Sequence, residues 1–227
     1  MSLPHYLGEA GRHYHGVKRG LPVRALPWVI RLRAAKFAAH VQPTDTVLEY
    51  GVGAGWNLAG LNCARKIGID VSEAIEEQAR NLGIEFFSSS AALPAALADV
   101  VICHHMLEHA IAPAQVLFEI KRLLKPSGVL LLNVPCERPC LCAQFVKDEP
   151  NHHLYSWNVQ SLGNLVLECG FEFEHMRLQR FRFDRAAAVW ADRIGLGERT
   201  YRTIRRVGLW ILPEYEIAVR AQPKPEC

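Results

Sequence analysis

The most informative segment of the sequence is Thr46-Val47-Leu48-Glu49-Tyr50-Gly51-Val52-Gly53-Ala54-Gly55. Its first half is rich in strand-forming residues, and a helix-compatible segment, residues 57–64, follows the glycines. Glycines at such a turn let the backbone approach a ligand closely, because no Cβ stands in the way. Ligands of open α/β sheets bind at the carboxyl ends of strands. The stretch therefore predicts a strand, a loop and a helix that together carry a binding site.

On either side of this unit, strand-like and helix-like segments alternate. The expected strands are residues 46–50, 67–71, 84–87, 99–103 and 129–134, and the helices between them are 57–64, 72–82 and 113–124, with Ser72 as an N-cap. This alternation predicts a mainly parallel sheet joined by right-handed crossovers. A basic helix at 27–40 precedes it; a helix at 157–169 that ends at Gly170, strands at 171–174 and 213–219, and an Arg-rich helical insertion at about 184–212 follow it.

Asp70 lies at the end of the second expected strand, 19 residues after Gly51. A carboxylate at this place suits a ribose, because it accepts hydrogen bonds from both hydroxyls of the diol. A dinucleotide site would need a third glycine at the position of Trp56, where close packing of helix on strand leaves no room for an indole. A nicotinamide-dependent dehydrogenase is therefore disfavoured.

Four motifs together resemble the class I S-adenosylmethionine-dependent methyltransferases of the small-molecule type. They are Glu-x-Gly-x-Gly-x-Gly at 49–55 with Asp70, the segment DVVICHHMLEH at 99–109, LLKPSGVLL at 123–131 and HLYSW at 153–157. The resemblance implies an α/β, Rossmann-like, doubly wound sheet of seven strands. That sheet is mostly parallel with an antiparallel last strand, and helices cover both faces.

The same resemblance implies S-adenosylmethionine as the cofactor. The residues it assigns to cofactor binding are Tyr14, Glu49, Gly51, Gly53, Gly55, Asp70, Val71, Ser89 and His104. Glu49 and the glycines would hold the methionine part and Asp70 the ribose. Ser89 stands where the family has an aspartate near the adenine, so its contact would be uncharged. Tyr14 belongs to an N-terminal segment that would either fold over the cofactor as a lid or remain a solvated tail.

Three residues are candidates for the chemistry of transfer: His105, His153 and Tyr155. His105 follows the fourth expected strand, at the edge of the sheet that would face the ligand. His153 and Tyr155 fall in a region that, in the resembling enzymes, faces the acceptor. Each could act as an acid or base or only line the pocket, because positioning and desolvation supply much of the rate of methyl transfer.

The segment from Arg177 to Arg206 is strongly basic. It holds nine Arg, no Lys and three acidic residues, so its net charge is 9 − 3 = +6 in a chain whose total is +3. With Trp190 and Trp210 nearby, it could face RNA phosphates, an anionic substrate or anionic lipid, or it could be a solvated helical face. The small total charge excludes binding to nucleic acid by bulk charge alone.

The remaining composition indicates a reduced globular protein. Half of the residues are hydrophobic, and seven cysteines are too few for a disulfide scaffold. Cys136, Cys140 and Cys142 could bind zinc or a metalloid, but their spacing favours incidental thiols, and we expect no metal. Without a secretory signal or an apolar run of about 20 residues, the chain is expected to be cytoplasmic with no transmembrane segment.

The sequence thus predicts an N-terminal helical lid segment, residues 1–40, and a methyltransferase domain, residues 41–227. The expected activity is transfer of a methyl group from S-adenosylmethionine to a small-molecule acceptor. Two alternatives stay open: a methyltransferase of RNA or protein that uses the Arg-rich segment, and a non-catalytic protein that binds S-adenosylmethionine. We expect no clear nucleic-acid partner and allow for a homodimer.

Overall fold

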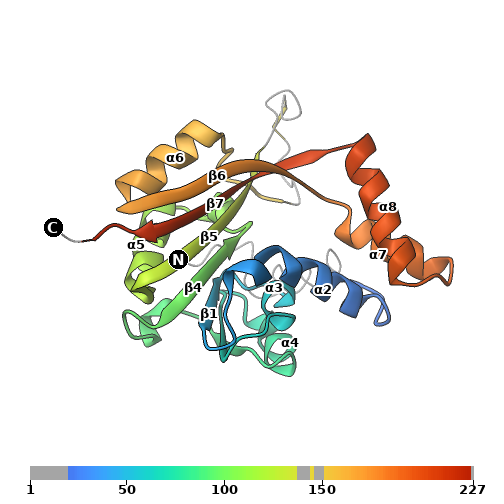
Figure 1. The fold of residues 1–227 in the computed structure, drawn as a ribbon, viewed down its shortest axis with the longest axis horizontal. Coiled ribbons are helices and arrows are strands. Elements are labelled where there is room, and N and C mark those ends of the chain that lie inside the picture. The colour runs from blue at the N-terminus through green and yellow to red at the C-terminus, as the bar shows by residue number, and fades with distance from the viewer. Residues whose placement is uncertain (1–19, 137–143, 146–150, 226–227) are drawn as a thin grey trace.

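The computed structural model describes residues 20–136, 144–145 and 151–225, and over these residues the chain forms a seven-stranded sheet (Figure 1). The strand order is β3-β2-β1-β4-β5-β7-β6. The strands are β1 (Thr46–Tyr50), β2 (Arg65–Ile69), β3 (Glu85–Phe87), β4 (Ala98–His104), β5 (Leu124–Cys136), β6 (Phe171–Phe181) and β7 (Glu214–Pro223). Strands β1 to β5 pair in parallel, while β7 is antiparallel to both β5 and β6. The expected fold class, with its antiparallel last strand, is confirmed.

Helices cover both faces of the sheet. They are α2 (Leu26–Phe37), α3 (Trp56–Ala59), α4 (Glu76–Asn81), α5 (Pro113–Leu123), α6 (Val159–Glu168), α7 (Asp184–Arg193) and α8 (Glu198–Ile211). Successive strand residues point to opposite faces, so Leu48 of β1 packs in one core with α5 and α6, while Val47 packs in the other with α2, α3 and α4. The sheet is therefore the middle of three layers.

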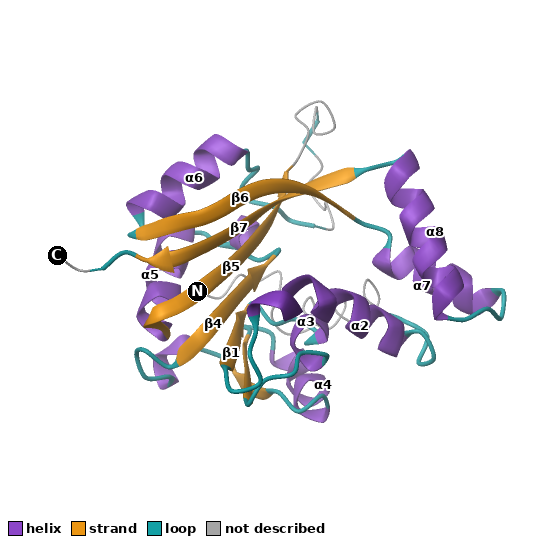
Figure 2. Cartoon of the chain, in the orientation of Figure 1, coloured by secondary structure: helices purple, strands orange, loops and turns teal. Residues whose placement is uncertain are grey.

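The hairpin of α7 and α8 lies at the end of the molecule away from α5 and α6 (Figure 2). It is the expected Arg-rich insertion, and its helical character is confirmed. A third apolar cluster joins it to α2, where the buried ring of Tyr201 in α8 stacks on Trp28 with ring centroids 6.1 Å apart. The insertion is thus anchored to the helix that precedes the sheet.

Several helices and strands begin or end at residues other than those expected. Helix α3 ends at Ala59 instead of residue 64. Strand β5 begins at Leu124 and so includes a stretch that was expected to be a turn. It begins there because Leu124 already pairs with Ala98 of β4, before a shift in register. Strand β6 extends to Phe181, since it pairs with β7 over its whole length. The backbone at Gly170 has φ +80°, as expected after the end of a helix.

The expected N-cap at Ser72 is wrong in its chemistry. Its side chain makes no capping hydrogen bond, and the first turn is the short 3-10 helix Glu73–Ile75. Its backbone N–H instead donates to Asp70 Oδ1 at 3.0 Å. Of the predicted lid segment, residues 1–19 lie outside the described residues, while α2 accounts for most of the remainder.

Candidate active site

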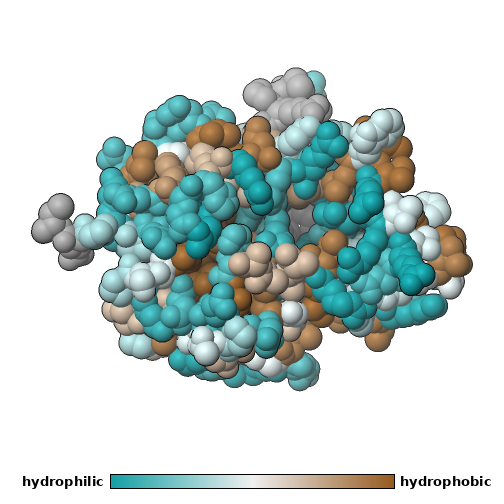
Figure 3. Space-filling model, in the orientation of Figure 1, coloured by the Kyte–Doolittle hydropathy of each residue, from teal (hydrophilic) through white to brown (hydrophobic). Residues whose placement is uncertain are grey.

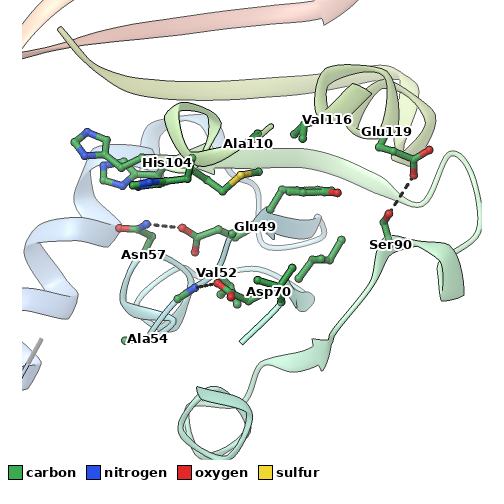
Figure 4. A pocket seen from close by; sticks show the side chains of 18 of the residues that line it. Glu49, Val52, Ala54, Asn57, Asp70, Ser90, His104, Ala110, Val116 and Glu119 are labelled. Carbon is green, nitrogen blue, oxygen red and sulfur yellow. Dashed lines mark hydrogen bonds between the residues drawn. The ribbon is translucent and has the colours of Figure 1, made fainter. Parts of the chain in front are cut away.

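A cavity of about 500 Å³ opens at the carboxyl ends of β1, β2 and β4. This volume is typical of a small-ligand pocket. Its walls come from the glycine loop after β1, from Asp70 and Val71 after β2, from the serine loop after β3 and from residues 104–106 at the end of β4. Figure 4 shows that Glu49, Asp70 and His104, from three neighbouring strands, lie around the same space.

The glycine loop has a backbone that only glycine adopts easily. Gly51, Gly53 and Gly55 have φ values of +80°, +50° and +75°. A Cβ at Gly51 would lie 2.3 Å from Cγ of Met106, so the loop and the segment after β4 are in direct contact. Gly51 and Gly53 line the cavity, whereas Gly55 packs behind the loop against Ile84. The sequence pattern therefore predicts loop shape better than it predicts which glycines face a ligand.

Asp70 fixes the loop at the edge of the cavity. Its Oδ2 accepts a hydrogen bond of 2.9 Å from the backbone N–H of Gly53 (Figure 4), and its Oδ1 accepts one of 3.0 Å from the backbone N–H of Ser72. The carboxylate thus holds together the two loops that follow β1 and β2. A carboxylate accepts several hydrogen bonds at once, so these bonds are compatible with binding to a diol.

Glu49 is the buried acid of the site, with 1% of its surface exposed. Its Oε1 accepts a hydrogen bond of 2.5 Å from Nδ2 of Asn57 (Figure 4). The carbonyl oxygen of Asn57 and the indole Nε1 of Trp56 have no hydrogen-bond partner among the described residues, although both atoms are buried and both residues line the cavity. Buried polar atoms of this kind are costly unless a ligand or water meets them.

The structure brings most of the predicted cofactor residues to this cavity. Those that line it are Glu49, Gly51, Gly53, Asp70, Val71, Ser89 and His104. The Ser89 hydroxyl accepts a hydrogen bond from the backbone N–H of Ala91, so it also shapes its own loop. Tyr14 lies outside the described residues.

The three predicted catalytic residues separate into two places. His105 lines the cavity. His153 does not, but its ring lies 4.9 Å from that of His109, which does. The Tyr155 hydroxyl donates to the carbonyl oxygen of Ile111 at 3.0 Å, so the tyrosine supports the wall of the cavity from behind.

Sequence reasoning missed a buried carboxylate under the site. Glu216 of β7 is fully buried and contacts both histidines: its Oε2 lies 2.9 Å from Nε2 of His105 and 3.7 Å from Nε2 of His104. Lys36 of α2 forms an ion pair with Glu216 and donates a hydrogen bond of 2.9 Å to His104. Gln179 and Asn133 also donate to this carboxylate. Glu216 interrupts the apolar end of the last predicted strand, which was the available signal.

Burial and pairing shift the pKa values of this network. Burial opposes ionisation of Glu216, but the hydrogen bond from His105 and the charge of Lys36 outweigh it and lower the Glu216 pKa to about 2. Burial lowers the pKa of His105, and Glu216 only partly offsets this. Burial likewise lowers the pKa of Lys36. At neutral pH the carboxylate is therefore ionised and the His105 ring neutral, so His105 donates from Nε2 and keeps a lone pair on Nδ1.

A metal ion does not suit this cluster. His104, His105 and Glu216 place possible ligand atoms within 4.8 Å of one another. However, the ammonium of Lys36 already contacts both Glu216 and His104, where it would repel a cation. Of the cysteines weighed for metal binding, Cys136 is half-buried, and Cys140 and Cys142 lie outside the described residues.

Comparison with known proteins now adds to this geometry. A family model described as a methyltransferase domain matches residues 23–176. A curated protein from Mycolicibacterium smegmatis, described as a probable S-adenosylmethionine-dependent methyltransferase, is 32% identical over 145 residues. That match covers 60% of this chain and 55% of the relative, so the chain spans about half the length of the curated relative it matches.

Solved structures share the fold at low sequence identity. The 1,6-didemethyltoxoflavin N1-methyltransferase of Burkholderia thailandensis has a TM-score of 0.62 at 18% identity, with 99% of this chain and 92% of that chain covered. An S-adenosylmethionine-dependent methyltransferase from Aquifex aeolicus has a TM-score of 0.55 at 20% identity, with 85% and 92% covered.

The sheet order, the glycine loop and the acidic residues at the carboxyl ends of β1 and β2 define a Rossmann-like fold. The chain belongs to the methyltransferase domain family, and the expected class I, S-adenosylmethionine-dependent type is confirmed. S-adenosylmethionine is the cofactor of this class. Within the described ranges, no helix is both long and apolar enough to cross a membrane.

Proposed function

We propose that this protein binds S-adenosylmethionine in the cavity at the ends of β1, β2 and β4 and transfers its methyl group to a small-molecule acceptor. The observation that carries the proposal is the convergence of Glu49, Asp70 and the glycine loop on one cavity that also reaches His105. An acid at the carboxyl end of each of two adjacent strands suits a ligand with both an amino-acid end and a ribose.

The cofactor fits the polar groups that line this cavity. The buried carbonyl oxygen of Asn57 would accept from the ammonium of the methionine end, and the Trp56 indole would donate to its carboxylate. Asp70 would accept from the ribose hydroxyls, and Ser89 would lie near the adenine. Bound here, S-adenosylmethionine supplies a methyl group on a positively charged sulfur. Glu49 lines the cavity, so its carboxyl group would lie near this cationic ligand.

His105 is the best-placed group to take the proton that an acceptor loses as it gains the methyl group. Its Nε2–H is held by Glu216 at 2.9 Å, and its lowered pKa keeps the ring neutral near pH 7. Nδ1 is then free to receive a proton, and the ionised Glu216 stabilises the resulting imidazolium. His153 and Tyr155, which lie against residues of the cavity wall, are proposed to shape the acceptor side.

A small acceptor agrees with the cavity volume of about 500 Å³, which falls in the range of small-molecule sites. The fold itself accommodates such an acceptor, since the similar Burkholderia thailandensis enzyme has 1,6-didemethyltoxoflavin bound together with S-adenosylhomocysteine.

Calorimetric titration with S-adenosylmethionine and with S-adenosylhomocysteine tests the cofactor part. The wild type is expected to bind both, and Asp70→Asn to bind both more weakly by about 1.5–3 kcal/mol, the scale of hydrogen bonds to a charged group. Asp45→Asn is the matched control, because Asp45 also accepts a backbone N–H bond, from Gln42, but lies outside the cavity. A folded protein that binds neither molecule would contradict the proposal.

A labelling experiment tests the acceptor class. The protein is incubated with methyl-labelled S-adenosylmethionine and a cell extract, which is then separated into small molecules, RNA and protein. Label is expected in the small-molecule fraction, and less of it with His105→Gln. Label that appears mainly in RNA or protein would replace the small-molecule acceptor by a macromolecular one. Cofactor binding without any transfer would favour the non-catalytic alternative.

A further inference from the structure

Helix α8 has an inner face that fixes its orientation. Tyr201 is buried against Trp28, and Arg205 donates to Asp184 of α7 at 2.6 Å. Gly208 lies so close to the ring of Phe183 that an added Cβ would be 3.0 Å from it. These contacts hold α8 on α7 and α2, and they leave its opposite face at the surface.

The outer face of α8 and the residue after it expose large apolar side chains beside arginines. Trp210 is 77% exposed, and Val207, Ile211 and Leu212 are each at least half exposed. Arg199 and Arg206 are exposed on the same helix. Figure 3 shows brown apolar atoms next to teal polar ones at this end of the molecule. Clustered apolar groups of this kind mark an interaction site.

A shallow groove of about 380 Å³ lies beside this apolar group. Its lining is Leu32, Leu209, Trp210, Arg180, Arg202, Arg205 and Arg206. Arg202 pairs with Glu198 and Arg205 with Asp184, whereas Arg180 and Arg206 have no ion pair within the described part of the chain. The groove is therefore positively charged and suited to a phosphate group, which guanidinium groups bind in a forked geometry.

We propose that this face of α8 docks on an anionic membrane surface, with lipid phosphates in the arginine groove and Trp210, Ile211 and Leu212 in the boundary of the acyl chains. Helices that lie in this boundary combine a basic polar face with aromatic and aliphatic residues. RNA would be met by phosphate contacts and stacking, which leave Ile211 and Leu212 without a role. A protein partner, including a second copy of this chain, would bind without vesicles and independently of lipid composition, so the experiment separates it from a membrane.

Vesicle flotation tests the proposal with the full chain and without cofactor, so the result does not depend on methyl transfer. Wild type is expected to float with vesicles of equal parts phosphatidylglycerol and phosphatidylcholine, but not with phosphatidylcholine alone, and to bind less as salt rises. We expect vesicle binding to fall by about tenfold or more in the double variant Arg180→Glu/Arg206→Glu, and also in the variant Trp210→Ser.

Two control variants carry single substitutions of the same types elsewhere on the surface. Arg80→Glu alters an exposed arginine of α4, and Phe118→Ser alters an aromatic residue of α5 that is 53% exposed. Both should float as wild type does, and circular dichroism should show all variants folded. Flotation that is absent in wild type, or equal in all variants, would overturn the proposal. The proposal would also be overturned if wild type did not bind the vesicles and instead bound RNA in a salt-sensitive way, or dimerised, and the groove variants lost that binding.

Discussion

At the scale of single residues, the pair His105 and Glu216 offers a direct test. Burial lowers the His105 pKa, and the hydrogen bond from His105 to Glu216 raises it in part. Removal of the negative charge in Glu216→Gln should therefore lower the His105 pKa further below its ordinary value of 6.5. The imidazole nitrogen signals, followed by NMR from neutral to acid pH, measure this directly.

His40 is the internal control in the same spectra. Burial lowers its pKa too, with further lowering by Arg220, His175 and Arg177, but Glu216 is not among the groups that act on it. The His40 titration should therefore be the same in both proteins. A His105 pKa that rises in Glu216→Gln, or does not move, would show that the carboxylate does not hold that ring.

The difference between what could and could not be foreseen is also clear at this scale. Glu49, Gly51 and Asp70 were accessible from the sequence, because each stands at a strand end: Glu49 and Gly51 share one short motif, and Asp70 follows 19 residues after Gly51. Glu216 and Lys36 were not, since 180 residues separate them and only the antiparallel entry of β7 beside β5 brings them together. Asn57 was missed because a helix-compatible segment gives no sign of which side chain turns toward a ligand.

At the scale of elements, the loop between β1 and α3 depends on the absence of side chains. Gly51→Ala would place a Cβ 2.3 Å from Met106 Cγ and 2.7 Å from its Cβ, at a φ of +80°. The change should destabilise the protein by about 1–2 kcal/mol for the backbone conformation and a further 1–3 kcal/mol for overpacking. Urea unfolding followed by circular dichroism gives the free energy of unfolding.

Gly83→Ala separates these two contributions. Gly83 has a φ of +74°, almost the same as Gly51, but an added Cβ there would meet no atom within 4 Å. This variant should therefore show only the cost of the backbone conformation. Equal losses in the two variants would mean that Met106 moves aside freely and that the loop and the segment after β4 are not tightly packed.

Element boundaries were less predictable than element order. The alternation of strands and helices, read from local periodicity, gave the order correctly from β1 to β5. The length of β6 was underestimated because its outer half is held by pairing with β7, a contact that local sequence does not encode. The hairpin of α7 and α8 was predicted to be helical. The sequence did not show which face of the hairpin points outward, because that depends on tertiary contacts with α2.

At the scale of the whole molecule, Glu216 links several elements. From β7 it contacts Lys36 of α2, His105 after β4, Asn133 of β5 and Gln179 of β6. Loss of one partner from a buried ion pair typically costs 3–5 kcal/mol, because the remaining charge stays buried without compensation. The network therefore ties the antiparallel part of the sheet to α2 and to the floor of the cavity.

The low pKa of Glu216 makes this contribution depend on pH. The folded-state pKa of about 2 lies below the ordinary value of 4.5, so the stabilisation is fully present above pH 4.5 and is lost as the pH falls through 2. The shift corresponds to roughly 3 kcal/mol, of which about half should be gone near pH 3. The difference in unfolding free energy between wild type and Glu216→Gln should shrink accordingly in urea titrations from pH 7 downward.

Glu214→Gln is the control on the same strand as Glu216. It breaks the exposed ion pair between Glu214 and Arg182, and it should lower the free energy of unfolding by less than about 1 kcal/mol at neutral pH. A difference for Glu216→Gln that stays constant down to pH 3 would mean that the carboxylate is not held ionised by Lys36 and His105, and that α2 is joined to the sheet by apolar packing alone.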